Sequence, residues 1–191
     1  MLRLTNSLAE ANDLYAWQNN MEHIHGQTYQ RMCTYYTGLT PEEIACKVNS
    51  MSALRAKLDW AETVKGRGPL DRVIAFVGME AIMFQIPFLI LSDISLDDLN
   101  VGLHLIMRDE ETHAEFGMLL LEHALKSCDE EGKRELKSRI RYLWGSIVEV
   151  EESFVDECLI EESGLPTRVC LMQFVKSCTD RYFLSHPSSD L

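Results

Sequence analysis

Glycine and proline are scarce in this chain, and nearly all of them fall between long segments with helical periodicity. Ten glycines and five prolines occur in 191 residues. No segment shows the alternation of apolar and polar residues that is typical of a half-buried strand. The contents of hydrophobic residues (46%) and charged residues (25%) are those of a globular protein and argue against a disordered chain. The sequence therefore predicts an all-α fold.

Basic residues are also in the minority. Eighteen lysines and arginines stand against 30 acidic residues, which gives a net charge of -12. A nucleic-acid interface needs a basic patch, so we expect no nucleic-acid partner. The six cysteines include no CxxC pair, and the first residues do not form a basic-then-apolar signal segment. Scattered free thiols are typical of a reducing compartment, and we expect a cytoplasmic protein.

Capping and helix-breaking residues divide the chain into six expected helices. They cover about residues 7–36, 40–64, 69–91, 95–127 and 129–162, and the last one follows Pro166. Thr40 and Glu43 form a capping-box pattern around Pro41, which suits a first helical turn. Pro87 lies inside the third helix, where its missing amide predicts a kink or a bulge. Long helices with short connections pack as antiparallel neighbours, so we expect a helical bundle.

One of these helices contains a long apolar run, VIAFVGMEAIMFQIPFLIL, over residues 73–91. Its one charged residue is Glu80. A buried carboxylate is costly, so it stays protonated, finds a partner or binds a metal. The run is long enough to span a membrane, but Glu80 and Pro87 interrupt it and the sequence contains no second candidate. We therefore expect a core helix and no membrane partner.

Two other helices each contain a Glu-x-x-His pair. Glu22 precedes His25 by three residues, and Glu110 precedes His113 by the same interval. Residues three apart share one helix face, so each pair can bind one metal ion or bridge two. Carboxylate with imidazole suits iron or manganese, whereas an iron–sulfur cluster needs thiolates. Each pair taken alone is more simply an exposed ion pair. With Glu80 on a third helix, however, the pattern is that of ferritin-like di-iron carboxylate proteins.

The segments around these residues resemble the small subunit of ribonucleotide reductase. MEHIHGQTY resembles the segment with the first Glu-x-x-His, VIAFVGMEAIMF the helix with a lone glutamate, and LIMRDEETHAEF the Arg-Asp-Glu-x-x-His signature. KLDWAE, IVEVEESFVDECL and CLMQFVKSCTDRYF resemble further landmarks of the eukaryotic and viral branch. The resemblance covers nearly the whole chain. It implies an R2-type ferritin-like bundle that forms a single domain over residues 1–191.

The resemblance also implies a role for each matching residue. Those implied to bind two iron ions, or manganese in their place, are Glu22, His25, Glu80, Glu110 and His113. Tyr29 lies four residues after His25 on the same helix face, and it matches the tyrosine that is oxidised to a stable radical. Asp109 and Gln18 match polar positions behind the ligands. The residues that match the apolar pocket around the radical, a role compatible with ordinary core packing, are Phe84, Phe88 and Ile106.

The chain departs from the family pattern at both ends. The family's first metal ligand is an aspartate on an earlier helix, and no segment here matches that helix, so we expect five of the six protein ligands. Asp13 is a poor substitute, because nine helical residues separate it from Glu22 by about 13 Å. The chain also stops short of the family's flexible C-terminal tail. We therefore expect an incomplete small subunit that lacks the first ligand-bearing helix.

Two functions remain open from the sequence. The first is the radical-generating small subunit of ribonucleoside-diphosphate reductase, a homodimer that works with the large subunit to convert ribonucleotides to deoxyribonucleotides. The second is a catalytically inactive homologue that acts by binding a partner. Another ferritin-like oxidase or an iron-storage protein fits Tyr29 and the RDEETH segment less well.

Overall fold

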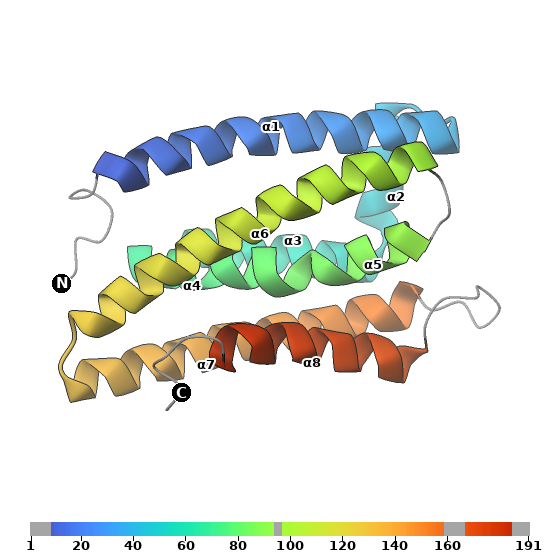
Figure 1. The fold of residues 1–191 in the computed structure, drawn as a ribbon. Coiled ribbons are helices and arrows are strands. Elements are labelled where there is room, and N and C mark those ends of the chain that lie inside the picture. Colours follow the sequence, from blue (N-terminus) through green and yellow to red (C-terminus); the bar gives the residue numbers. More distant parts are fainter. Residues whose placement is uncertain (1–8, 94–96, 159–166, 185–191) are drawn as a thin grey trace.

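The described residues form a bundle of helices. In the computed structural model these residues are 9–93, 97–158 and 167–184, and they contain no strand. The helices are α1 (Ala9–Thr37), α2 (Pro41–Ser50), α3 (Ser52–Lys65), α4 (Pro69–Gly78), the π-helix η1 (Met79–Met83), α5 (Gln85–Asp93), α6 (Asp97–Lys126), α7 (Glu130–Cys158) and α8 (Arg168–Leu184). The long helices lie alongside one another, with α1 next to α6 and α7 next to α8 (Figure 1). The predicted all-α bundle is confirmed.

The centre of the bundle is the continuous segment α4–η1–α5, which packs against α6 and α7. Two glycines allow the close approach. A Cβ atom on Gly78 would lie 2.4 Å from Cδ1 of Ile147, and one on Gly117 would lie 2.3 Å from Cγ2 of Val77. Neither contact is possible between real atoms, so the backbones meet there only because both side chains are absent. Glu80 follows directly after this tight packing and is buried.

Several predicted helix ends are confirmed. The first helix ends at Thr37, and Gly38 follows it with a φ of 67°, a left-handed conformation that glycine adopts without strain. Thr40 and Glu43 form the capping box, with bonds of 2.8 and 3.3 Å between each side chain and the other residue's amide. The expected cap near Ser95 lies outside the described residues, as does the chain beyond Cys158 in the fifth expected helix.

The prediction of one helix over residues 40–64 is wrong. The chain breaks at Met51, whose φ of -85° and ψ of 116° are extended, and a new helix begins at Ser52. The Glu157 carboxylate on α7 accepts hydrogen bonds from the amides of Ser52 and Ala53. These are amides that the start of a helix leaves without partners. The break is therefore stabilised by a side chain more than 100 residues away.

The bulge predicted from Pro87 is present, and it begins before the proline. The amide of Phe84 donates to the carbonyl of Met79 at 3.2 Å, five residues back instead of four. This π-helical turn carries Glu80 near its start. Within the described residues, one helical stretch, Pro69–Ser92, is long and apolar enough to cross a membrane, and 61% of the apolar 18-residue window within it is buried inside the bundle. Most of that window therefore lies in the core of the bundle.

Candidate metal centre

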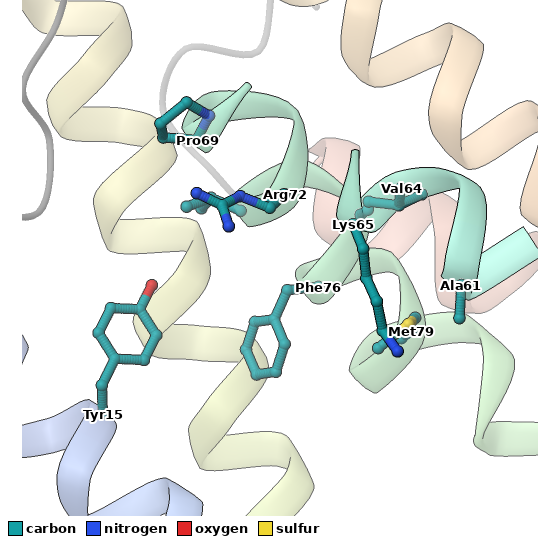
Figure 2. Close-up of a pocket in the computed structure, with 10 residues that line it drawn as sticks. Tyr15, Ala61, Val64, Lys65, Pro69, Arg72, Phe76 and Met79 are labelled. Carbon is teal, nitrogen blue, oxygen red and sulfur yellow. The ribbon is translucent and has the colours of Figure 1, made fainter. Parts of the chain in front are cut away.

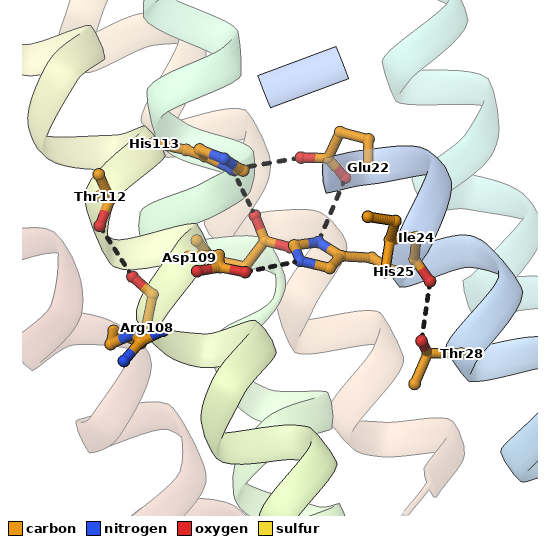
Figure 3. A network of polar contacts seen from close by, with 9 residues as sticks. Glu22, Ile24, His25, Thr28, Arg108, Asp109, Thr112 and His113 are labelled. Atoms are coloured by element: carbon orange, nitrogen blue, oxygen red, sulfur yellow. Dashed lines mark hydrogen bonds and ion pairs between the residues drawn. The ribbon is translucent and has the colours of Figure 1, made fainter. Parts of the chain in front are cut away.

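Three helical segments bring the predicted ligands together. Gln18, Glu22, His25 and Tyr29 follow one another at intervals of three or four residues on α1, so they share one face of that helix. The π-helix η1 contributes Glu80, and α6 contributes Asp109, Glu110 and His113. The side chains of α1 and α6 meet between the two helices (Figure 3). The predicted ligands farthest apart in sequence, Glu22 and His113, are separated by 91 residues.

Four of these residues form a compact group of possible metal ligands. One ligand atom from each of Glu22, Glu80, Glu110 and His113 lies within 4.8 Å of the others. Glu80, Glu110 and His113 are buried, whereas the side chain of Glu22 is 41% exposed. Three carboxylates with one imidazole are a ligand set that suits iron or manganese. The described residues therefore include a group able to bind a metal ion.

Glu110 lies between the two imidazoles. Its Oε1 is 2.9 Å from Nδ1 of His25, and its Oε2 is 3.0 Å from Nδ1 of His113. His113 Nδ1 is also 3.2 Å from Oε1 of Glu22, and the two imidazole centroids are 6.2 Å apart. A carboxylate whose oxygens face different imidazoles is placed to bridge two metal ions. His25 is outside the compact group of four but reaches it through Glu110.

Two further polar residues lie next to the ligands. Asp109 Oδ2 is 3.2 Å from Nε2 of His25, and an ionised carboxylate can only accept a hydrogen bond there. The bond therefore favours the His25 tautomer with its proton on Nε2, which leaves the lone pair of Nδ1 directed toward Glu110. Gln18 is buried one turn before Glu22. Its Oε1 has no hydrogen-bond partner among the described residues.

The hydrogen bonding of the cluster is incomplete in a way that fits a cation. Within the described part of the chain, the buried atoms without a hydrogen-bond partner include Glu22 Oε1, His25 Nδ1, Glu80 Oε2 and His113 Nε2. Two of them, Glu22 Oε1 and His25 Nδ1, have close polar neighbours, but not in hydrogen-bonding geometry. A buried polar group without a partner costs about 1–3 kcal/mol. The residues present therefore fit bound metal ions, which would accept these lone pairs.

Without metal, the cluster has to hold protons. Burial, together with the neighbouring Glu110 and Glu22, raises the pKa of Glu80 to about 11. Burial also opposes the charged forms of Glu110 and His113, but the bonds among these groups outweigh it. The pKa of Glu110 is held below its usual value, and that of His113 is raised to about 9. Metal binding must therefore displace protons from the site.

Tyr29 lies beside the ligands in an apolar cluster. Burial raises the pKa of its phenol well above the ordinary value, and Glu110, Glu22 and Glu80 add to this rise. The predicted pocket residues Phe84, Phe88 and Ile106 all belong to this cluster. The prediction missed its other members, which are Met32, Leu91, Leu103 and Met107. Helical spacing could have identified Met32 and Leu103, because each is three residues from a predicted member on its own helix.

The predictions from the sequence also did not include a buried ion pair next to η1. Lys57 Nζ on α3 lies 2.6 Å from Oε1 of Glu151 on α7. The sequence contains a signal for Lys57, because it falls on the same stripe of α3 as the buried residues Ala53 and Val64. Glu151 lies on the buried stripe of α7 in the same way. A charged residue on an apolar stripe is expected to have a buried partner.

A cavity of about 420 Å³ lies between α1, α3 and α4 (Figure 2). Its walls include Tyr15, Val64 and Phe76, with Lys65 and Arg72 contributing positive charge. None of the predicted site residues lines this cavity. It is therefore separate from the candidate metal centre.

Comparison with known proteins relates this arrangement to one family. Residues 5–185 match the family described as "Ribonucleotide reductase, small chain". The chain is 27% identical to "Ribonucleoside-diphosphate reductase subunit M2" of Homo sapiens, with 93% of this chain and 46% of that protein covered. It is 26% identical to the "Ribonucleoside-diphosphate reductase small chain" of Yaba-like disease virus, over 93% and 55% of the two chains. The "Ribonucleoside-diphosphate reductase small subunit" of Dictyostelium discoideum is also 26% identical, over 93% and 53%. The chain spans about half the length of the curated relatives it matches.

Proposed function

Because the chain belongs to the ribonucleotide reductase small-chain family, we propose that it is a radical-generating component of ribonucleoside-diphosphate reductase. The observation that carries this proposal is the placement of Tyr29 beside a cluster of buried carboxylates and imidazoles with unpaired polar atoms. The metal would be a pair of iron ions, with manganese as the other candidate. The fold of the family is the R2-type ferritin-like bundle, and we propose that residues 1–191 form one such domain.

The proposed ligands are Glu22, His25, Glu80, Glu110 and His113. Glu110 would bridge the two ions, because its oxygens face different imidazoles. Asp109 orients His25 and keeps a proton on the ring nitrogen that faces away from Glu110. When bound and exposed to oxygen, the ions would supply the one-electron oxidation of a nearby tyrosine.

The surroundings of Tyr29 suit a radical. Its raised pKa keeps the phenol protonated, so oxidation of Tyr29 must release one proton together with one electron. The product is a neutral phenoxyl group, which an apolar pocket accommodates without a desolvation cost for charge. Phe84, Phe88 and Ile106 limit the access of water and small reductants to that group. Core packing and protection of a radical are thus served by the same side chains.

The remaining parts of the proposal concern assembly. The partner would be the large subunit of ribonucleotide reductase, which receives the radical and reduces ribonucleotides to deoxyribonucleotides. We propose a homodimer of this chain in the cytoplasm, where the six free cysteines would stay reduced.

Anaerobic loading with Fe(II), followed by oxygen, tests the proposal. We expect about two iron ions per chain, near-ultraviolet absorption of ferric iron, and an electron paramagnetic resonance signal from a tyrosyl radical. Tyr29→Phe should abolish the radical signal and leave iron binding unchanged, because the phenol oxygen is not among the proposed ligands. A well-folded wild-type protein that binds no iron would overturn the proposal. That result would favour the catalytically inactive, partner-binding homologue.

A further inference from the structure

The π-helical turn that carries Glu80 ends at Met83, whose backbone carbonyl lacks its usual hydrogen-bond donor. In an α-helix, the carbonyl of Met83 would accept a hydrogen bond from the amide of residue 87. That residue is Pro87, which has no amide hydrogen. Met83 is buried, so its carbonyl needs another donor inside the protein. The position of Pro87 thus leaves an acceptor to be satisfied one turn after Glu80.

Lys57 supplies the donor. Its Nζ donates to the carbonyl oxygen of Met83 at 3.1 Å, although Lys57 belongs to a different helix and is only 9% exposed. A cavity of about 320 Å³ adjoins Met83 and Pro87, and Lys57 is the one charged residue among the described residues that line it. The other lining residues are apolar, so they offer no competing side-chain donor to the carbonyl.

The remaining contacts of the Lys57 ammonium hold it in this place. Oε1 of Glu151 lies 2.6 Å away, and the ring centroid of Phe154 lies 3.8 Å away. Glu151 is fully buried on α7. The ammonium on α3 donates a hydrogen bond to η1 and forms an ion pair with α7, so it connects the three segments at one point.

The other end of the π-helical turn is also held by a side chain. Nε2 of Gln85 donates to the carbonyl oxygen of Glu80 at 3.1 Å. The carbonyls of Glu80 and Met83 are therefore both bonded to side chains, at the start and the end of the turn. The two bonds therefore hold the backbone from which the Glu80 side chain extends toward the candidate metal centre.

Burying the ion pair of Lys57 and Glu151 costs free energy, because both charges are removed from water. Burial lowers the pKa of Lys57, against the effect of Glu151, and raises the pKa of Glu151 to about 7. A buried ion pair often stabilises a protein no better than apolar side chains of the same size. The bond to Met83 gives this pair a function that two apolar side chains could not perform.

We propose that Lys57 is a positioning residue whose ammonium, held by Glu151, replaces the amide that Pro87 lacks and so fixes the turn that presents Glu80. The part of the inference that concerns metal binding rests on the proposed function. The part that concerns the turn does not.

The central test variant removes both members of the ion pair, so the site has no net charge, as in the wild type. Lys57→Met in a Glu151→Gln background removes the donor and leaves no buried charge, and Glu151→Gln alone is its reference. Pro87→Ala, added to the double variant, returns a backbone amide four residues after Met83. Arg139→Met is the matched control, because Arg139 pairs with Asp71 and so links α7 to α4 without touching η1.

The first measurement is amide hydrogen exchange of the metal-free protein. Relative to Glu151→Gln, the double variant should exchange about tenfold faster over residues 80–90 while α6 and α8 stay unchanged. Addition of Pro87→Ala should restore most of the protection. Arg139→Met should leave exchange over residues 80–90 at the wild-type rate. Unchanged exchange in the double variant, or no recovery with Pro87→Ala, would overturn the inference.

The second measurement is the affinity for Mn(II). The double variant should bind about tenfold more weakly than Glu151→Gln, as is typical when a group that orients a ligand is lost, and Pro87→Ala should recover the affinity. An unchanged affinity despite faster exchange would overturn the positioning of Glu80. If the wild-type protein binds no Mn(II) or Fe(II), the proposed function fails, and hydrogen exchange still decides the role of Lys57.

Discussion

Nε2 of His25 lies 3.2 Å from Oδ2 of Asp109, so a residue of α1 is oriented by a residue of α6 that is itself next to Glu110. The contact leaves Nδ1 of His25 facing Oε1 of Glu110 at 2.9 Å. One face of α6 therefore both contributes a proposed ligand and controls the tautomer of another.

Asp109→Asn should weaken metal binding by about tenfold to a hundredfold, because the amide can donate to His25 and stabilise the wrong tautomer. Titration of the metal-free protein with Mn(II) or Fe(II) measures this change. Glu115→Gln, an exposed acid on the same helix, is the matched control and should bind metal as the wild type does. Equal affinity of Asp109→Asn and wild type would show that Asp109 does not orient a ligand.

Glu80→Gln should separate folding from metal binding. Burial keeps Glu80 protonated at neutral pH in the metal-free protein, and glutamine has nearly the shape of a protonated glutamate. The free energy of unfolding without metal should therefore change by less than about 1 kcal/mol. The amount of metal bound should fall, because an amide is a weak ligand. Urea denaturation and metal analysis check the two statements, and a large loss of stability would mean that Glu80 is ionised without metal.

Gly117→Ala should destabilise the bundle by about 1–3 kcal/mol, because the added methyl group would meet Cγ2 of Val77 in a packed interior. Val77 is β-branched and buried, so it cannot easily move aside. Gly145→Ala is the control, since no atom lies within 4 Å of its added Cβ. It should stabilise α7 by about 0.5–1 kcal/mol through helix propensity. Similar effects of the two changes on the urea midpoint would contradict the tight contact of α4 with α6.

The stability of the metal-free protein should depend on pH through Glu151. Burial raises its pKa from 4.5 to about 7, with Lys57 acting in the opposite direction. A carboxyl group with a raised pKa contributes stability below its unfolded pKa, and this contribution is lost as the pH rises through the folded value. The free energy of unfolding should therefore decline between about pH 4.5 and about pH 7 because of this group.

The double variant Lys57→Met/Glu151→Gln removes both titrating groups and serves as the comparison. The pH-dependence of its urea midpoint should be shallower than that of the wild type over the same window. Parallel curves would show that the titration of Glu151 is not linked to folding.

Much of the fold could be predicted because its signals are local. The capping box of Thr40 and Glu43 and the glycine after Thr37 act within a few residues, and the structure contains both. The break at Met51 could not be predicted in this way, because the carboxylate of Glu157 that caps the new helix lies about 100 residues away in sequence. Nothing in residues 49–53 alone indicates that partner.

The candidate site likewise combines features that the sequence could predict with features that it could not. The sequence by itself determined which groups share a helix face, as in Glu22 with His25, and it singled out Glu80 by its apolar surroundings. Only the tertiary structure decided that Glu110 lies between two imidazoles and that Lys57 bonds to the carbonyl left free by Pro87. Spacing along a helix is set by the backbone geometry of a few residues. Contacts between helices depend on packing, which excludes water and brings distant groups into reach of one another.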